Sequence, residues 1–133
     1  MDEPYEQSLA HEHHYTVEQA NAARPWVRER VGRIQGALEE LRLPASRELF
    51  DELDPADGGG YPGRPIARAV LDILWAASEL QAVDVVLRDA DKGLVDFPSI
   101  RDGEEIYLCW LAEEPRVGWW HEPEAGFAGR QPL

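Results

Sequence analysis

The fold is decided by the stretch EIYLCWLAEEPRVGWWH, residues 105–121. Residues 105–111 are rich in aromatic and large apolar side chains, which favour an extended strand. Residues 116–121 have the same character, and residues 112–115 suit a hairpin connection between the two runs. The stretch therefore predicts two antiparallel strands that both carry large aromatic side chains.

The register of this hairpin decides which side chains share a face. The register that gathers the most apolar area on one face pairs Trp110 with Val117, Leu108 with Trp119, and Ile106 with His121. A slip of one residue instead places Cys109 on the face of Trp119 and His121. We favour the first register. In both, Trp119 and Trp120 point in opposite directions, so we expect helices to cover one face of the sheet and the C-terminal tail or a second subunit to cover the other.

Two shorter strands are expected before the hairpin. Residues 85–88 and 94–97 have extended patterns, and the segment 89–93 between them ends in a glycine that suits a bulged turn. Residues 85–133 are thus predicted to form a four-stranded antiparallel β-meander followed by an ordered C-terminal tail.

The first part of the chain has helical periodicity. Thr16 and Gln19 have the spacing of a capping box at a helix start. Apolar side chains then recur at coiled-coil spacing: Ala20, Val27, Val31, Ile34, Leu38 and Leu41. Pro25 removes one backbone hydrogen bond, so we expect a kink or restart near it, and the helix should end near Leu43.

A second helix is expected to begin at Pro65. Its apolar stripe consists of Ile66, Val70, Ile73, Ala77 and Leu80, and its apolar face is widened by Leu71, Leu74 and Trp75. Residues 15–84 are therefore predicted to form a long antiparallel helical hairpin, with an acidic glycine-rich loop at 44–63 and a short helical turn at 47–53. The first helix should reach about 39 Å and extend beyond the rest of the domain, which leaves apolar surface for a second subunit.

Length, charge and cysteine content restrict the class of protein. A chain of 133 residues with 44% hydrophobic residues suits one α+β domain, here residues 15–133. The net charge of −13 argues against nucleic acid and anionic membranes as partners. A single cysteine and the absence of a long apolar run favour a cytoplasmic location. Residues 1–14 are acidic and His-rich, and we expect them to form a disordered tail.

Several short motifs resemble the bacterial family named domain of unknown function 2203. They are TVEQAN (16–21), RDAD (88–91), GLVDFP (93–98), RDG (101–103), YLCW (107–110), EP (114–115), WHE (120–122) and the closing residues 126–133. The resemblance covers residues 15–133. The family commonly has lysine where this chain has Arg88, and the acidic loop is longer here. No activity, cofactor or partner is implied by this resemblance, so a functional site has to be predicted from the chemistry of the side chains.

A divalent-metal or acid–base site is one hypothesis. Its candidate residues are one histidine, the cysteine and several carboxylates: His121, Cys109, Asp89, Asp91, Asp96, Glu114 and Glu122. Imidazole and carboxylates are usable metal ligands, and both hairpins could deliver them to one end of the sheet. The spacing matches no zinc signature, and Ile100 at the twelfth position excludes an EF-hand loop that starts at Asp89. The alternative is that the carboxylates cap turns and His121 is a hydrogen-bonded core residue.

Two other groups are assigned structural roles. Cys109 could act as a nucleophile if a histidine activated it, but in the favoured register it faces away from His121, so we interpret it as an apolar strand residue. His11, His13 and His14 flank Glu12 and could hold a metal adventitiously, yet they fall in the expected disordered tail.

Association is the hypothesis that the sequence favours. Trp119, Trp120 and Arg130 are residue types that dominate binding energy at interfaces, and we expect a homodimer. Arg130 could instead fix the tail by pairing with Asp96 or Glu122. The sequence thus predicts a small cytoplasmic bacterial protein that acts by self-association or by binding another protein. The alternative is a metal-binding or carboxylate/His-based enzyme with its site at one end of the meander; no substrate follows from the sequence.

Overall fold

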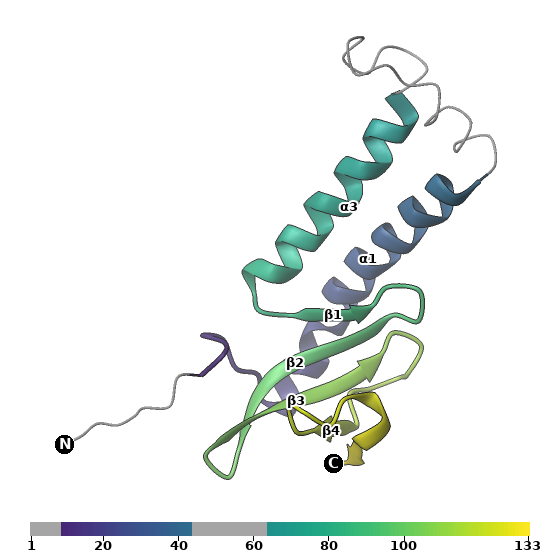
Figure 1. Ribbon diagram of the computed structural model, residues 1–133. Coiled ribbons are helices and arrows are strands. Elements are labelled where there is room, and N and C mark those ends of the chain that lie inside the picture. The colour runs from purple at the N-terminus through teal and green to yellow at the C-terminus, as the bar shows by residue number, and fades with distance from the viewer. Residues whose placement is uncertain (1–8, 44–63) are drawn as a thin grey trace.

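A helical hairpin stands on a small antiparallel sheet in the computed structural model, which describes residues 9–43 and 64–133 (Figure 1). Helix α1 (Val17–Arg42) and helix α3 (Arg64–Ala82) lie side by side, and both extend well beyond the sheet (Figure 1). The predicted helical turn at 47–53 and the glycine-rich loop lie outside the described residues. In the described part of the chain, neither helix is long and apolar enough to cross a membrane.

Helix α1 begins and ends as its sequence predicts. The backbone N–H of Gln19 donates to Thr16 Oγ1 at 3.0 Å, and the backbone N–H of Thr16 donates to Gln19 Oε1 at 3.0 Å, which completes the capping box. The helix passes through Pro25 as one element and ends with Leu43 as its C-cap, so the alternative of a restart near Pro25 is wrong. Its buried side chains form a single stripe: Ala20, Val27, Val31, Ile34 and Ala37.

Helix α3 buries a narrower face than predicted. Its buried residues are Ile66, Ala69, Ala76 and Leu80. Leu71, Leu74 and Trp75, which we expected to widen this face, are instead 63%, 59% and 63% exposed. The reason is that α3 packs along α1 and contacts the sheet mainly at β1, so no further layer among residues 9–43 and 64–133 packs on its outer side.

The sheet is a meander in sequence order, and it has one strand more than predicted. Its strands are β1 (Val86–Asp89), β2 (Leu94–Arg101), β3 (Glu104–Leu111), β4 (Trp119–His121) and β5 (Gln131–Pro132). The added strand β5 belongs to the C-terminal tail, which is ordered as expected. Gly93, the turn glycine before β2, has a φ of 68° that a residue with a side chain rarely adopts.

The favoured register of the last hairpin is wrong, and the slipped register is the observed one. The pairs are Tyr107 with His121, Leu108 with Trp120, and Cys109 with Trp119. The cause lies outside the hairpin, because the backbone N–H of Val117 donates to Asn21 Oδ1 of α1 at 2.8 Å instead of pairing with β3. Strand β4 therefore begins only at Trp119.

The two faces of the sheet differ in character. One face packs on the helices, where Phe97, Leu108 and Trp110 join Val27 and Val31 of α1 in the hydrophobic core. The other face carries Asp96, Cys109 and His121 on three adjacent strands: Asp96 pairs directly with Cys109, and His121 pairs with Tyr107, two residues before Cys109. A short 3-10 helix, η3 (Phe127–Gly129), follows β4 and precedes β5 in the C-terminal tail.

Candidate functional site

Three buried side chains with metal-binding atoms meet on the face away from the helices. We call Asp96, Cys109 and His121 the Asp96 cluster. One donor atom from each residue lies within 4.8 Å of the other two, and the side chains are 2%, 0% and 2% exposed. Asp96 of β2 is the direct partner of Cys109 of β3, and His121 of β4 lies on the same face of the sheet. The slipped register is what brings them together.

The imidazole of His121 is held at both nitrogens. Nδ1 lies 2.7 Å from the backbone carbonyl of Glu122, and Nε2 lies 3.0 Å from Asp96 Oδ2. A carbonyl oxygen only accepts, so Nδ1 carries the proton of that bond and Nε2 is directed at Asp96. The backbone thus fixes the orientation of the ring and presents Nε2 to the cluster.

Only one of the two carboxylate oxygens of Asp96 has polar partners among the described residues. Oδ2 accepts a hydrogen bond from Arg88 Nε at 2.9 Å and also faces His121. Oδ1 is buried and has no hydrogen-bond partner among the described residues. A buried carboxylate oxygen without a donor is costly, and such atoms usually have a partner in native proteins.

The thiol of Cys109 is protonated at neutral pH. Burial, and next the negative charge of Asp96, raise the pKa of Cys109 to about 11. The nearby Arg130 guanidinium, with Nη1 3.9 Å from Sγ, acts in the opposite direction but does not overcome these effects. A free thiolate nucleophile is therefore not present, although the residue lies on the face of His121, contrary to our expectation.

A pocket of about 230 Å³ adjoins the cluster, and the C-terminal tail forms one of its walls. Its lining residues are Arg88, Leu94, Asp96, Cys109, His121, Pro123, Glu124, Gly126 and Phe127. This pocket gives a small ligand room beside the cluster.

The tail is fixed by Arg130, but through a partner that we did not predict. Its Nη2 pairs with Glu114 Oε2 at 2.7 Å, and not with Asp96 or Glu122. The guanidinium also lies 4.6 Å from the ring centre of Trp119 and 4.5 Å from that of Phe127. Glu114 holds the loop before β4 as well, because its Oε1 accepts from the backbone N–H of Leu111 at 2.9 Å.

Of the candidate metal ligands, the structure brings Asp96, Cys109 and His121 together and leaves the others apart. Asp89 caps its own turn by accepting from the backbone N–H of Lys92, and Asp91 forms an ion pair with Arg42 of α1 at 2.7 Å. The side chain of Glu122 is exposed, and only its backbone carbonyl takes part. Cys109 was among the candidates, but the favoured register turned it away from His121, and the observed register brings it into the cluster.

The two adjacent tryptophans make intramolecular contacts on opposite faces. Trp119 stacks under Arg130, while Trp120 packs against the hydrophobic core and has the guanidinium of Arg101 4.4 Å from its ring centre. Both are half-buried. A role for Trp119, Trp120 and Arg130 in binding a partner stays a prediction.

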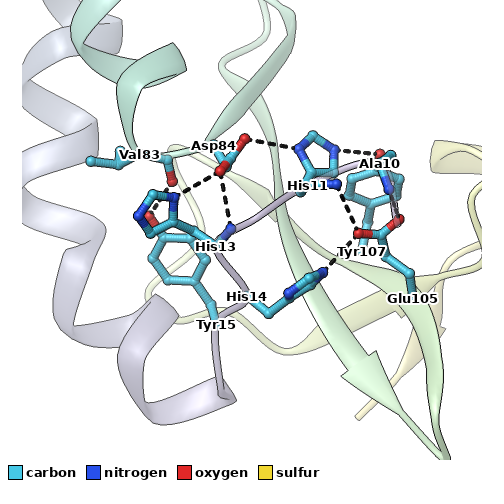
Figure 2. Close-up of polar contacts among 9 residues, drawn as sticks. All are labelled: Ala10, His11, His13, His14, Tyr15, Val83, Asp84, Glu105 and Tyr107. Atoms are coloured by element: carbon cyan, nitrogen blue, oxygen red, sulfur yellow. Dashed lines mark hydrogen bonds and ion pairs between the residues drawn. The ribbon is translucent and has the colours of Figure 1, made fainter. Parts of the chain in front are cut away.

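The N-terminal segment contradicts our expectation of disorder in the part that the structure describes. Residues 9–14, which we call the N-terminal strap, lie against the sheet edge (Figure 2). His11 and His13 contact Asp84 at 3.1 and 2.8 Å, and His14 contacts Glu105 at 2.7 Å. Two carboxylates from distant parts of the chain thus order a segment that is polar by composition.

Fold and site together define an α+β protein with a helical hairpin, a β-meander and a buried Asp–Cys–His cluster. The sequence matches the family described as uncharacterized conserved protein (DUF2203) over residues 13–133, so the chain belongs to this family and the resemblance is confirmed. The match begins at His13, inside the strap. No significant match was found among curated proteins or among solved structures.

Proposed function

We propose that this protein binds a divalent transition-metal ion at the Asp96 cluster. The observation that carries the proposal is the convergence of a carboxylate, a thiol and an imidazole within 4.8 Å, with one buried carboxylate oxygen left without a donor. Chance clusters of acidic groups are common on protein surfaces, but these three residues are all buried. A cation there gives Asp96 Oδ1 the partner that it lacks.

The donor set favours zinc or a metal with similar preferences. A nitrogen, a sulfur and an oxygen ligand are typical of zinc sites, in which three protein ligands leave a fourth position to water or substrate. The adjoining pocket of about 230 Å³ provides room for that fourth ligand. Such a metal supplies Lewis acidity and lowers the pKa of a bound water, which is the chemistry of hydrolytic sites.

The surroundings of the cluster resemble those that hold metal ligands in other proteins. Metal-bound histidines usually donate their second ring N–H to a carbonyl or carboxylate, as His121 Nδ1 does to Glu122. Arg88 holds Asp96 through Oδ2 and leaves Oδ1 for the metal. Because the thiol of Cys109 is protonated in the metal-free protein, binding must release its proton, so affinity should rise with pH.

Metal content of variants tests this proposal. Untagged full-length protein is incubated with Zn²⁺, dialysed and analysed for bound metal, together with the Cys109→Ala and His121→Ala variants. Glu122→Gln serves as a matched control, because its carboxylate is exposed and outside the cluster. His13→Ala serves as a second control, because this histidine is 60% exposed and the one most open to adventitious binding.

We expect close to one metal ion per chain in the wild type and in both controls, and none in the two cluster variants. Circular dichroism verifies that the variants are folded. Wild-type protein without bound metal, or protein whose metal disappears in His13→Ala but not in Cys109→Ala, would overturn the proposal.

We further propose that the chain forms a homodimer through the outer side of α3. Leu71, Leu74 and Trp75 are each about three-fifths exposed, and Leu74 and Trp75 both lie about one helical turn from Leu71 on the outer side of the helix. They line a shallow hollow together with Asp72 and Ser78. Contiguous exposed apolar side chains of this size are typical of association surfaces.

The mass of the protein in solution tests this second proposal. We expect a dimer in sedimentation experiments and a monomer for Trp75→Glu, which places a charge in the centre of the surface. Trp26→Glu is the matched control and should remain dimeric, because Trp26 of α1 is 37% exposed and does not line this hollow. Because each chain carries a net charge of −13, added salt should strengthen the association by screening repulsion. A wild-type monomer at all accessible concentrations contradicts the proposal.

A further inference from the structure

The N-terminal strap is attached to the sheet by three histidines from one short segment. His11 and His13 contact the two oxygens of Asp84 in the connection between α3 and β1, and His14 contacts Glu105 of β3 (Figure 2). The backbone N–H groups of Ala10 and His11 also donate to Glu105, at 2.9 and 3.2 Å. The strap is thus fixed by both its side chains and its backbone.

One contact of the strap leads toward the Asp96 cluster. His11 Nε2 lies 2.9 Å from the hydroxyl of Tyr107, and the two rings meet edge to face with centres 5.6 Å apart (Figure 2). Tyr107 is buried on β3, and its ring centre lies 5.6 Å from that of His121. Arg88, which holds Asp96, lies 4.9 Å from the same tyrosine ring centre. Tyr107 thus contacts one member of the cluster and the residue that orients another.

The position of the proton on the His11 ring sets the direction of the hydrogen bond between His11 and Tyr107. Asp84 as a carboxylate only accepts, so His11 Nδ1 carries the proton of the bond to Asp84. A neutral His11 then has an unprotonated Nε2, which accepts the hydroxyl proton of Tyr107. The tyrosine is therefore held at its hydroxyl by the strap and at its ring by Arg88 and His121.

We propose that His11 is a positioning residue for the metal centre: the strap fixes Tyr107, and Tyr107 fixes His121 and Arg88 in the arrangement that binds a cation. This inference rests on the proposed metal site and adds to it a part of the chain that lies far from the ligands in sequence. Partners beyond the direct ligands commonly affect metal affinity by about tenfold or more.

A double-mutant cycle on full-length protein tests the inference, with Co²⁺ as the probe. The variants are His11→Phe, which keeps a ring but removes both nitrogens, Tyr107→Phe, which removes only the hydroxyl, and the two combined. His13→Ala is the matched control, because it removes a contact to Asp84 from the same strap without touching Tyr107. Thermal unfolding confirms that each variant retains the fold.

We expect His11→Phe and Tyr107→Phe each to weaken Co²⁺ binding by a similar factor, on the order of tenfold, and the combined variant to be no weaker than either. His13→Ala should bind as the wild type does. Unchanged affinity in both single variants, or effects that multiply in the combination, would overturn the inference.

A second readout separates this inference from the metal site itself. The ¹⁵N chemical shifts of the His121 ring nitrogens are measured in metal-free wild type, His11→Phe and His13→Ala. We expect a shift change in His11→Phe alone, because only that variant releases Tyr107 from the strap. If the wild type binds no Co²⁺, the proposed function fails, and these shifts still decide whether the strap positions His121: equal shifts in all three proteins contradict it.

Discussion

The two faces of the sheet bury side chains of different character, although these side chains come from neighbouring residues of the same strands. On β2, Phe97 is buried against the helices, while the adjacent Asp96 is buried on the opposite face beside His121. The first burial lowers the free energy of the folded state through apolar contact. The second places a carboxylate and an imidazole out of water, which seldom adds stability. We conclude that the helix-covered face determines the fold, while the polar face contributes little to stability and carries the proposed metal site.

The largest expected effect comes from the helix-covered face. Phe97 is fully buried and contacts Tyr15 and Trp110. Phe97→Ala should lower the free energy of unfolding by about 3–5 kcal/mol, because it removes a large apolar side chain and leaves a cavity. Urea unfolding measures this difference. A loss below about 1 kcal/mol would mean that this face does not determine the fold.

A single truncation on the polar face should cost less. Asp96→Ala leaves His121 Nε2 buried without its partner, and Arg88 loses an acceptor but is 42% exposed and can turn to solvent. We expect a loss of roughly 1–3 kcal/mol in the same urea experiment. A loss as large as that of Phe97→Ala would show that the polar face is as important for the fold as the apolar one.

Acid should loosen the N-terminal strap before it affects the core. Hydrogen bonds from His13, and further ones from His11, lower the pKa of Asp84 to about 2. Since its pKa in the unfolded chain is about 3.8, the stability that Asp84 contributes is present above pH 4 and is lost as pH falls toward 2. Stability measured from pH 5 to pH 2 should therefore fall less for Asp84→Asn than for the wild type. Parallel curves would contradict this account of the strap.

The smallest effect on stability is expected when the buried polar pair is replaced as a whole, and this variant separates the roles of the two faces most clearly. The combined variant Asp96→Leu with His121→Phe replaces a buried polar pair by apolar groups of similar size. Such replacements are often neutral or stabilising, so we expect its free energy of unfolding to lie within about 1 kcal/mol of the wild type or above it. Metal binding should be lost completely. A strongly destabilised double variant would show that the pair has a structural role.

Local signals in the sequence predicted most of the fold. The capping box at Thr16 and the proline after Leu43 correctly placed both ends of α1, because helix ends depend on neighbouring residues. The order of the strands also followed from short turns between extended runs. The exposure of Leu71, Leu74 and Trp75 could not be foreseen, since apolar periodicity does not reveal whether a second layer is present.

The candidate site was predicted only in part, and the misplacement of Cys109 goes with a single long-range contact. The side-chain oxygen of Asn21 in α1 accepts a hydrogen bond from the backbone N–H of Val117, and the pairing of β4 with β3 is shifted by one residue from the predicted register. The register was predicted from the apolar area that the hairpin residues gather on one face. That comparison could not include a bond to α1, so Cys109 was assigned to the wrong face. The same limitation hid the strap, because the carboxylates that hold His11, His13 and His14 come from Asp84 and Glu105, far along the chain.

The absorption spectrum of the protein during titration with Co²⁺ tests the central claim most directly. A sulfur ligand gives a thiolate-to-cobalt charge-transfer band, so the spectrum reports Cys109 itself and not merely bound metal. We predict a band that saturates at one equivalent of Co²⁺ in the wild type and in Asp91→Asn, and that is absent in Cys109→Ala. A wild-type spectrum without this band, or the same spectrum in Cys109→Ala, would contradict a metal centre at the Asp96 cluster.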